Sequence, residues 1–375
     1  MTESGAGLPP VTGAWRAGDP PGARQWFTGP GALALEAGGA LPEYTLAYET
    51  WGRLNADRSN AVLVEHALTG DSHAAGPAGP GQVSAGWWDE LIGPGKAFDT
   101  DSLFVVAPNV LGGCQGSTGP SSPDPDGKPW GSRFPALTVR DQVAAEAALA
   151  DALGIDRWAA VAGGSMGGMR ALEWAVTLPG RVESVLVLAS TARASAEQIA
   201  WAAPQLHAIR SDVAWHGGDY YTAAEGPHRG LGVARRIAHV TYRCEPELRT
   251  RFGNRAQERE DPLRGGRFAV ESYLDHHADK LVRRFDAGSY AVLTESMNTH
   301  DVGRGRGGVA AALGRVTART VVASVDSDRL YPPYQSDEIA AGTGGTAAVL
   351  NSPYGHDSFL IETEQIAGLV KTLLG

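Results

Sequence analysis

The sequence predicts an α/β fold in which a mostly parallel sheet is flanked by helices. Between residues 61 and 191, short apolar runs of strand length alternate with segments of helix length. This alternation lapses over residues 192–310, where helical periodicity dominates, and it resumes from about residue 320. We therefore predict a core domain built from residues 1–191 and 311–375, with a helical lid inserted over residues 192–310.

The individual elements follow from apolar runs and from the residues that punctuate them. Residues 1–30 are rich in Pro and Gly and should form an extended or partly ordered lead-in. Thr138 and Asp141 form a capping-box pattern, and Gly154 can end the helix that follows. In chain order we expect strands at 61–64 and 103–107, a helix at 138–153, a strand at 158–162, a turn at 163–168, a helix at 169–178, a strand at 185–188, helices at 196–209 and 233–240, strands at 320–325 and 347–350, and a helix at 362–374.

The composition argues against several classes of protein. Of the 375 residues, 43% are hydrophobic and 20% charged, which is ordinary for a globular protein with a large core. The net charge of −10, without a dense basic run, argues against a nucleic-acid partner. Cys114 and Cys244 cannot build a disulfide framework, so a reducing cytoplasm is expected. We expect no signal peptide and no membrane partner, because no apolar stretch approaches about 18 residues.

One short motif points to covalent catalysis. Residues 163–167 are Gly-Gly-Ser-Met-Gly, a G-x-S-x-G sequence between an expected strand and an expected helix. In that setting the serine is exposed on a strained strand-to-helix turn, the nucleophile elbow, and the flanking glycines allow close backbone approach. Ser165 is therefore the candidate nucleophile. The alternative is a Gly-rich turn that contains an incidental serine.

A serine hydroxyl needs a general base and an acid that orients this base. Where a nucleophile elbow occurs, the acid and then the base follow the serine along the chain, on loops at the carboxyl ends of strands. His356 and Asp328 occupy such positions. Asp326 competes with Asp328, but it lies nearer the strand end, where it could cap the turn, so we favour Asp328. The alternative for His356 is a surface loop histidine.

Acyl transfer also needs N–H donors for the negative oxygen that develops on the attacked carbonyl group. The N–H of Met166, which directly follows the candidate nucleophile, is one candidate. The loop after an early strand should supply the second donor, and Leu68 within residues 66–70 is the candidate. Alternatively, His66 and Thr69 only stabilise this loop, which would still leave the backbone donor in place.

Several segments together resemble the homoserine O-acetyltransferase family. The similarity covers about residues 40–372. G-x-S-x-G alone is weakly specific, whereas the combination is highly specific. The segments are YETWGRLN at 48–55, HALTGDSH at 66–73, NVLGGCQGSTGP at 109–120, GGSMGG at 163–168, NTHDVGRGRGG at 298–308, SDRLYP at 327–332 and YGHD at 354–357.

The resemblance implies an α/β-hydrolase fold with a helical lid, a homodimer formed through the lid, and no bound cofactor. It implies transfer of acetyl from acetyl-CoA, as a substrate, to the hydroxyl of L-homoserine, a step of methionine biosynthesis. It assigns Ser165 as nucleophile, His356 as base and Asp328 as the orienting acid. Arg235 matches the arginine expected to hold the homoserine carboxylate, and Asp357 the acid expected to hold its ammonium group. The alternatives are a lid salt bridge for Arg235 and a helix N-cap for Asp357.

Other functions remain open at this point. A serine esterase could use the same triad and let water deacylate Ser165. A homoserine or serine O-succinyltransferase would differ only in the acyl group or in the acceptor. A non-catalytic protein on the same fold has little support, because every triad position is filled.

Three further patterns carry no assignment. Residues 303–308 match G-x-G-x-x-G, but they follow a polar segment instead of a strand, so we expect no dinucleotide site. The ten histidines show no metal-binding spacing, so we expect no metal ion. Cys114 lies near the expected site without an assigned base and is interpreted as packing.

Overall fold

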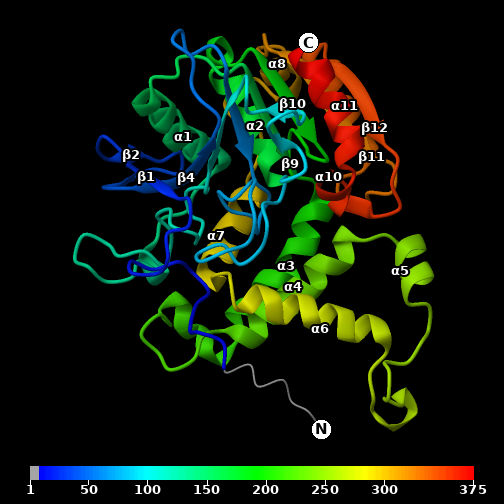
Figure 1. Ribbon diagram of the computed structural model, residues 1–375. Helices are drawn as coiled ribbons and strands as arrows, with labels where there is room; N and C mark the ends of the chain where they lie inside the picture. Colours follow the sequence, from blue (N-terminus) through cyan, green and yellow to red (C-terminus); the bar gives the residue numbers. More distant parts are fainter. Residues whose placement is uncertain (1–7) are drawn as a thin grey trace.

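The computed structural model describes residues 8–375 and centres on an eight-stranded sheet (Figure 1). The strand order is β1-β4-β8-β5-β9-β10-β11-β12. These strands are β1 (Gln25–Thr28), β4 (Thr45–Trp51), β5 (Ala61–Glu65), β8 (Phe104–Pro108), β9 (Ala160–Gly164), β10 (Ser184–Leu188), β11 (Arg319–Val325) and β12 (Thr346–Leu350). β4 pairs antiparallel with β1 and β8, whereas every pairing from β8 to β12 is parallel.

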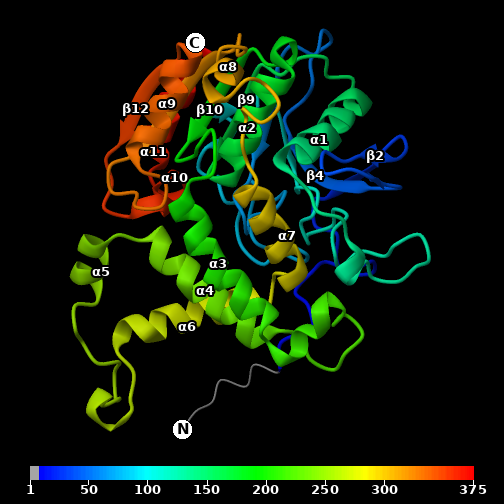
Figure 2. The ribbon, with the colours of Figure 1, turned by 180° about the vertical axis from the view of Figure 1, so that it is seen from behind.

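Helices lie on both faces of this sheet (Figure 1 and Figure 2). Strand side chains alternate between two hydrophobic clusters, so that Val185 and Val187 face one cluster while Leu186 and Leu188 face the other. The first cluster contains residues of α1 (Val139–Leu153), α2 (Met166–Thr177), α8 (Val309–Leu313) and α9 (Pro333–Thr343), and the second contains residues of α11 (Thr363–Leu374). The predicted sheet flanked by helices is thus confirmed.

A group of helices lies below the sheet in Figure 1, within the segment where helical periodicity dominates. α4 is at its centre and packs against both α3 and α6. The helices are α3 (Ala196–Arg210), α4 (His228–Tyr242), α5 (Glu245–Arg251), α6 (Ala269–Val282) and α7 (Ala287–Asn298). The boundaries of a core and an inserted lid stay a prediction.

Short elements complete the described chain. Two separate two-stranded ribbons are formed by β2 (Leu33–Ala34) with β3 (Ala40–Leu41), and by β6 (Ile92–Gly93) with β7 (Phe98–Asp99). Short helical segments are η1 (Gly131–Arg133), η2 (Pro179–Arg181), η3 (Val213–Gly218), η4 (Pro262–Arg264), η5 (Gly355–Asp357) and α10 (Ser358–Ile361). Among residues 8–375, no helix combines the length and apolar character needed to cross a membrane.

The structure corrects two sequence expectations. Of the lead-in expected over residues 1–30, residues 1–7 lie outside the described residues. The remaining part contains β1, which pairs with β4 at the sheet edge, and its Trp26 is partly exposed. A strand at the sheet edge pairs on one side only and is partly exposed. Its sequence therefore lacks the buried apolar run that is typical of a central strand. The sequence predicts that α2 begins at Met169, whereas it begins at Met166. Gly167 and Gly168 have the composition of a loop, but they belong to the first helical turn. The capping box of Thr138 and Asp141 is present as predicted.

Candidate active site

Ser165 occupies the sharp turn between β9 and α2. Its φ of 57° and ψ of −124° lie in a region that residues with a side chain rarely adopt. Its N–H donates to the carbonyl oxygen of Leu188 at 2.9 Å, and its own carbonyl oxygen accepts from Ser190 Oγ at 2.8 Å. Hydrogen bonds on both sides of the residue therefore stabilise this strained backbone.

The glycines on either side of Ser165 are needed for space. A Cβ atom added at Gly163 would lie 2.4 Å from the backbone of Gly167. One added at Gly167 would lie 2.0 Å from the carbonyl oxygen of Glu65, the last residue of β5. Because both distances are far below van der Waals contact, only glycine lets α2 approach the sheet this closely.

The structure brings Ser165, His356 and Asp328 into one hydrogen-bonded chain. His356 Nε2 lies 2.9 Å from Ser165 Oγ, and His356 Nδ1 lies 2.7 Å from Asp328 Oδ2. All three residues are buried. This is the geometry of a nucleophile, a base and an acid that orients the base.

Asp328, and not Asp326, reaches the histidine. The second oxygen of Asp328, Oδ1, accepts the backbone N–H groups of Leu330 at 2.8 Å and Tyr331 at 2.9 Å. Asp326 instead accepts the N–H of Ser352 at 3.0 Å and joins the loops after β11 and β12. The backbone of its own loop therefore fixes the Asp328 carboxylate while Oδ2 faces His356.

Aromatic rings hold the His356 side chain in place. The Tyr331 ring stacks on it with a centroid distance of 4.8 Å and an interplanar angle of 20°. Phe359 meets it edge-on at 5.3 Å, and the ring of Tyr242, the last residue of α4, lies at 5.8 Å. Gly355, with a φ of 67°, leaves no room for a Cβ against the carbonyl oxygen of Tyr242. The loop that carries the base is thus packed directly on α4.

The two candidate oxyanion donors lie close to the serine. Leu68 lines the same cavity as Ser165, and Leu68 and Met166 belong to one buried cluster. Met166 is the first residue of α2, so its N–H has no acceptor within the helix. Arg284 Nη1 donates to the carbonyl oxygen of Thr69 at 2.9 Å and so fixes the loop beside Leu68.

His66 also stabilises the loop at residues 66–70, which is the alternative role that the sequence offers for it. Its Nε2 accepts the N–H of Val110 at 3.0 Å, so the ring proton is on Nδ1 and is donated to the carbonyl oxygen of Ala67 at 2.8 Å. Burial, together with the nearby Arg170 guanidinium, lowers the pKa of His66 well below its ordinary value. A neutral His66 therefore joins the loop to the end of β8.

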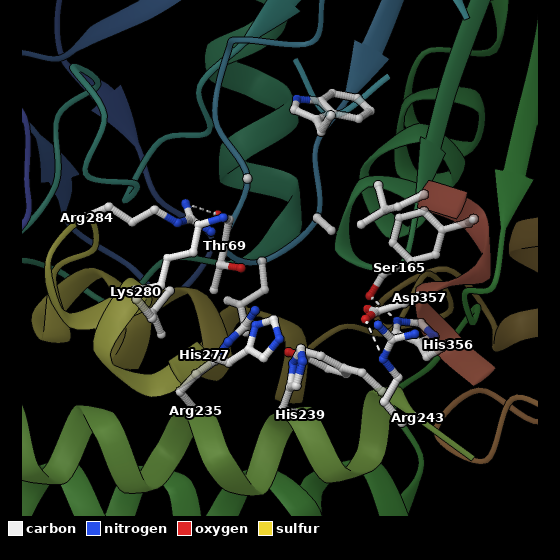
Figure 3. Close-up of a pocket in the computed structure, with 18 residues that line it drawn as sticks. Thr69, Ser165, Arg235, His239, Arg243, His277, Lys280, Arg284, His356 and Asp357 are labelled. Atoms are coloured by element: carbon white, nitrogen blue, oxygen red, sulfur yellow. Dashed lines mark hydrogen bonds and ion pairs between the residues drawn. The ribbon is translucent and has the colours of Figure 1, made fainter. Parts of the chain in front are cut away.

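A cavity of about 290 Å³ opens beside Ser165 (Figure 3). Ser165, His356 and Asp357 lie at one end of the view, and Lys280 and Arg284 lie toward the other. The charged groups of the lining are four cations and one acid, namely Arg235, Arg243, Lys280, Arg284 and Asp357. This excess of positive charge favours an anionic substrate.

Comparison with known proteins places the chain in a family. Residues 60–363 match the family described as alpha/beta hydrolase fold. A homoserine O-acetyltransferase of Thermobifida fusca (strain YX) is 67% identical over 368 residues, which cover 97% of each chain. The chain belongs to the homoserine O-acetyltransferase family of α/β hydrolases. The resemblance found in the sequence is thereby confirmed.

Solved structures show how widely the family architecture is shared. The homoserine O-acetyltransferase from Bacillus anthracis matches with a TM-score of 0.85 and 28% identity, covering 94% of this chain and 97% of that chain. Esterase E22 matches with a TM-score of 0.86 and 28% identity, covering 94% of this chain and 99% of that chain. The architecture therefore occurs both in a homoserine O-acetyltransferase and in an esterase.

Arg235 and Asp357, the other residues singled out by the family resemblance, both line the cavity. The Arg235 guanidinium carbon lies 5.6 Å from the ring centroid of Tyr242, and within residues 8–375 Arg235 forms no salt bridge. The lid salt bridge considered as an alternative for Arg235 is therefore not seen. Asp357 does not cap α10 with its side chain, and its Oδ2 lies 3.4 Å from Arg243 Nε. Asp357 thus occupies the N-cap position of α10 without forming the side-chain hydrogen bond of a cap.

Sequence reasoning missed several residues of the cavity wall. His239 and Tyr242 follow Arg235 on α4 at the i+4 and i+7 positions, and all three line the cavity. Helical spacing from Arg235 would have found both. Burial and the neighbouring Arg235 lower the pKa of His239 to about 2, so its ring is neutral. In the part of the chain that the structure describes, no cluster of three His, Cys, Asp or Glu side chains could hold a metal ion.

Cys114 is buried in the cluster that also contains Leu68 and Met166. Burial raises the pKa of its thiol, which disfavours the reactive thiolate. Cys114 therefore contributes packing beneath the site.

Proposed function

We propose that this protein is a homoserine O-acetyltransferase, which transfers an acetyl group from acetyl-CoA to the hydroxyl of L-homoserine. The observation that carries the proposal is the hydrogen-bonded chain of Ser165, His356 and Asp328 at a cation-lined cavity. It occurs in a chain 67% identical to a homoserine O-acetyltransferase over nearly its full length. Methionine biosynthesis is the process that such an enzyme would serve.

In the first half-reaction, Ser165 Oγ attacks the thioester carbonyl carbon and its proton passes to His356 Nε2. The N–H groups of Leu68 and Met166 stabilise the negative oxygen of the tetrahedral intermediate. When the intermediate collapses, the carbon–sulfur bond breaks and His356 returns the proton to the departing sulfur. Free CoA thiol leaves, and the acetyl group remains on Ser165.

In the second half-reaction, His356 removes the proton of the homoserine hydroxyl as this oxygen attacks the acyl carbon. The bond to Ser165 Oγ breaks, and His356 reprotonates the serine. Arg235 holds the acceptor carboxylate, for which a planar guanidinium is suited, and Asp357 holds its ammonium group. Ping-pong kinetics follow from the covalent intermediate.

Intact-protein mass spectrometry tests this proposal. Mixing the protein with acetyl-CoA should add about 42 Da, and homoserine should remove the adduct, as expected for an acyl-serine intermediate. The Ser165→Ala variant should carry no adduct. An adduct only with succinyl-CoA, or discharge by serine but not by homoserine, would point to the O-succinyltransferase or serine-acceptor alternatives instead.

A serine esterase is the second candidate, favoured by the structural match to esterase E22. In that case water would discharge the acetyl-enzyme. The rate of adduct loss, measured with and without homoserine, separates the two candidates. A rate that homoserine does not increase would refute the transferase proposal.

We further propose a homodimer formed through the lid and a cytoplasmic location. Ile199 on α3 and Val233 on α4 are apolar side chains that remain 40% and 43% exposed. Because α3 and α4 pack together, these side chains are candidates for the dimer contact. Light scattering should give a dimer mass for wild type and a monomer mass for Val233→Arg. A monomeric wild type would refute this part of the proposal.

A further inference from the structure

A buried cluster of three charged side chains lies directly beneath the oxyanion loop. Arg170, on α2, has Nη1 2.6 Å from Glu65 Oε2 and 2.7 Å from Glu146 Oε1. The exposed fractions of the three side chains are 0%, 0% and 1%, respectively. Taking charges out of water is costly, and a cluster buried this deeply is weak evidence for stability by itself.

Arg170 connects the two segments that carry the candidate oxyanion donors. It lies four residues after Met166, on the first turns of α2. Its Nη2 donates at 2.7 Å to the carbonyl oxygen of His66, which lies two residues before Leu68. One planar guanidinium thus holds the loop that carries one donor against the helix that carries the other.

We propose that Arg170 is a positioning residue for acyl transfer, which sets the separation of the Leu68 and Met166 N–H groups. This inference rests on the oxyanion hole assigned under the proposed function. Electrostatic stabilisation of the transition state depends on donors fixed in advance at the place where the charge develops. A loop displaced by about 1 Å would lower the rate while leaving substrate contacts elsewhere intact.

The two carboxyl groups of the cluster differ in their hydrogen bonds. Glu146 accepts hydrogen bonds from Arg170 Nη1 and from Trp174 Nε1, at 2.7 and 3.0 Å. Among the described residues, no donor reaches Glu65 in hydrogen-bond geometry. Burial, reinforced by the neighbouring Glu146 carboxylate, raises the pKa of Glu65 well above its ordinary value. The neutral form of Glu65 is therefore favoured, and Glu146 is the carboxyl group that Arg170 contacts in hydrogen-bond geometry.

The decisive experiment measures acylation of Ser165 by p-nitrophenyl acetate in Arg170→Lys. Lysine keeps the charge but lacks the planar fork that reaches Glu146 and the His66 carbonyl together. The burst rate per active site, counted with a serine-reactive fluorophosphonate, should fall about 10- to 100-fold. The dissociation constant of the ester, taken from the dependence of the burst rate on ester concentration, should change by less than about threefold, since only transition-state contacts are affected.

A matched control separates this effect from a loss of stability. Arg181 also donates to two backbone carbonyls, those of Ile155 and Asp156, and pairs with Asp151 at 2.7 Å. Arg181→Lys should keep the wild-type rate per titrated site. If Arg170→Lys only reduces the number of titratable sites and keeps the rate of each, the residue is structural and the proposal is overturned.

The two carboxylates provide a second test that does not depend on the folding of Arg170→Lys. Glu65→Gln replaces a neutral group by another neutral group and should change the rate little, whereas Glu146→Gln leaves Glu65 to supply the charge opposite Arg170 and should fold with a partial loss of rate. The double variant leaves Arg170 without a counter-ion and should be slowest per titrated site. Single and double variants that all keep the wild-type rate would overturn the proposal. Because p-nitrophenyl acetate requires no homoserine, a protein that shows the burst but acetylates no homoserine would refute the proposed function alone.

Discussion

Arg243 Nε lies 3.4 Å from Asp357 Oδ2, so the acid proposed to hold the acceptor ammonium already faces a cation. The exposed fractions of the two side chains are 13% and 20%, and both line the cavity. Burial raises the pKa of Asp357, and the charges of Arg243, Arg235 and His356 partly offset this effect. Under the proposed function, the incoming ammonium group would share the Asp357 carboxylate with Arg243.

Replacing Asp357 should separate the two half-reactions. In Asp357→Asn, the KM for homoserine should rise about 10- to 100-fold, because a charge-assisted hydrogen bond to the ammonium group is lost. The burst of acylation by acetyl-CoA should be unchanged, which stopped-flow measurement can check. Asp337→Asn, at an exposed position of α9, serves as the control. An equal loss in the acylation step would contradict the assignment of Asp357 to the acceptor.

The neighbouring acids Asp326 and Asp328 provide a matched pair of variants. Asp328→Asn should lower kcat by about 10³- to 10⁴-fold, because an amide does not stabilise the required histidine tautomer or the imidazolium. Asp326→Asn should change kcat little, since an amide oxygen can still accept the Ser352 N–H. Steady-state kinetics of both variants check the prediction. Similar losses of kcat in both variants would show that catalysis depends on the structure of the two loops and not on the Asp328 carboxylate.

Gly167 should not tolerate alanine, although alanine favours helices. The gain in helix propensity is about 1 kcal/mol, but the added Cβ would lie 2.0 Å from the Glu65 carbonyl oxygen and force α2 away from the sheet. We expect a lower thermal midpoint and a loss of most activity. Gly180→Ala, in open space without a positive φ, should leave both unchanged. A Gly167→Ala protein as active as wild type would contradict the close packing of the elbow.

Buried neutral histidines should make the protein less stable in mild acid. Burial lowers the pKa of His300 to about 4, whereas an unfolded histidine takes up a proton below about pH 6.5. Between these values the unfolded chain binds more protons, so the free energy of unfolding falls as the pH is lowered. From pH 7.5 to 5.5 the loss should be about 1.4 kcal/mol for one such histidine.

Urea unfolding at the two pH values measures this effect. His300→Gln can still donate to the carbonyl oxygen of Thr191, which His300 Nε2 contacts at 3.1 Å. In His300→Gln, the difference in the free energy of unfolding between pH 7.5 and pH 5.5 should therefore be smaller by about 1.4 kcal/mol. An identical pH dependence in the variant would show that His300 is not the group responsible.

The sequence predicts the part of the fold and of the site that is local along the chain. The inner parallel strands β5, β9, β10 and β11 are almost entirely buried, and the Ser165 motif defines both the elbow and the chain order of its partners. The Asp328 and Asp326 alternatives differ in which loop backbone each carboxylate contacts, and this depends on the path of the loop after β11.

Other features depend on segments that are distant in sequence. Arg170 and Glu65 are 105 positions apart. In the sequence, nothing distinguishes either of them from an ordinary charged residue of a helix or a strand. Arg243 and Asp357 meet only because the His356 loop packs on the end of α4. No local pattern encodes such meetings, because they arise from the packing of the whole chain.

The left-handed backbone of Ser165 also limits which amino acids can serve as the nucleophile. Threonine carries a similar hydroxyl, but its β-branched side chain is strongly disfavoured at a φ of 57°. Cysteine has no such branch and could occupy the turn. The backbone of the elbow therefore restricts evolutionary change at this position in addition to the chemistry. Replacement of the serine by cysteine fits this backbone better than replacement by threonine.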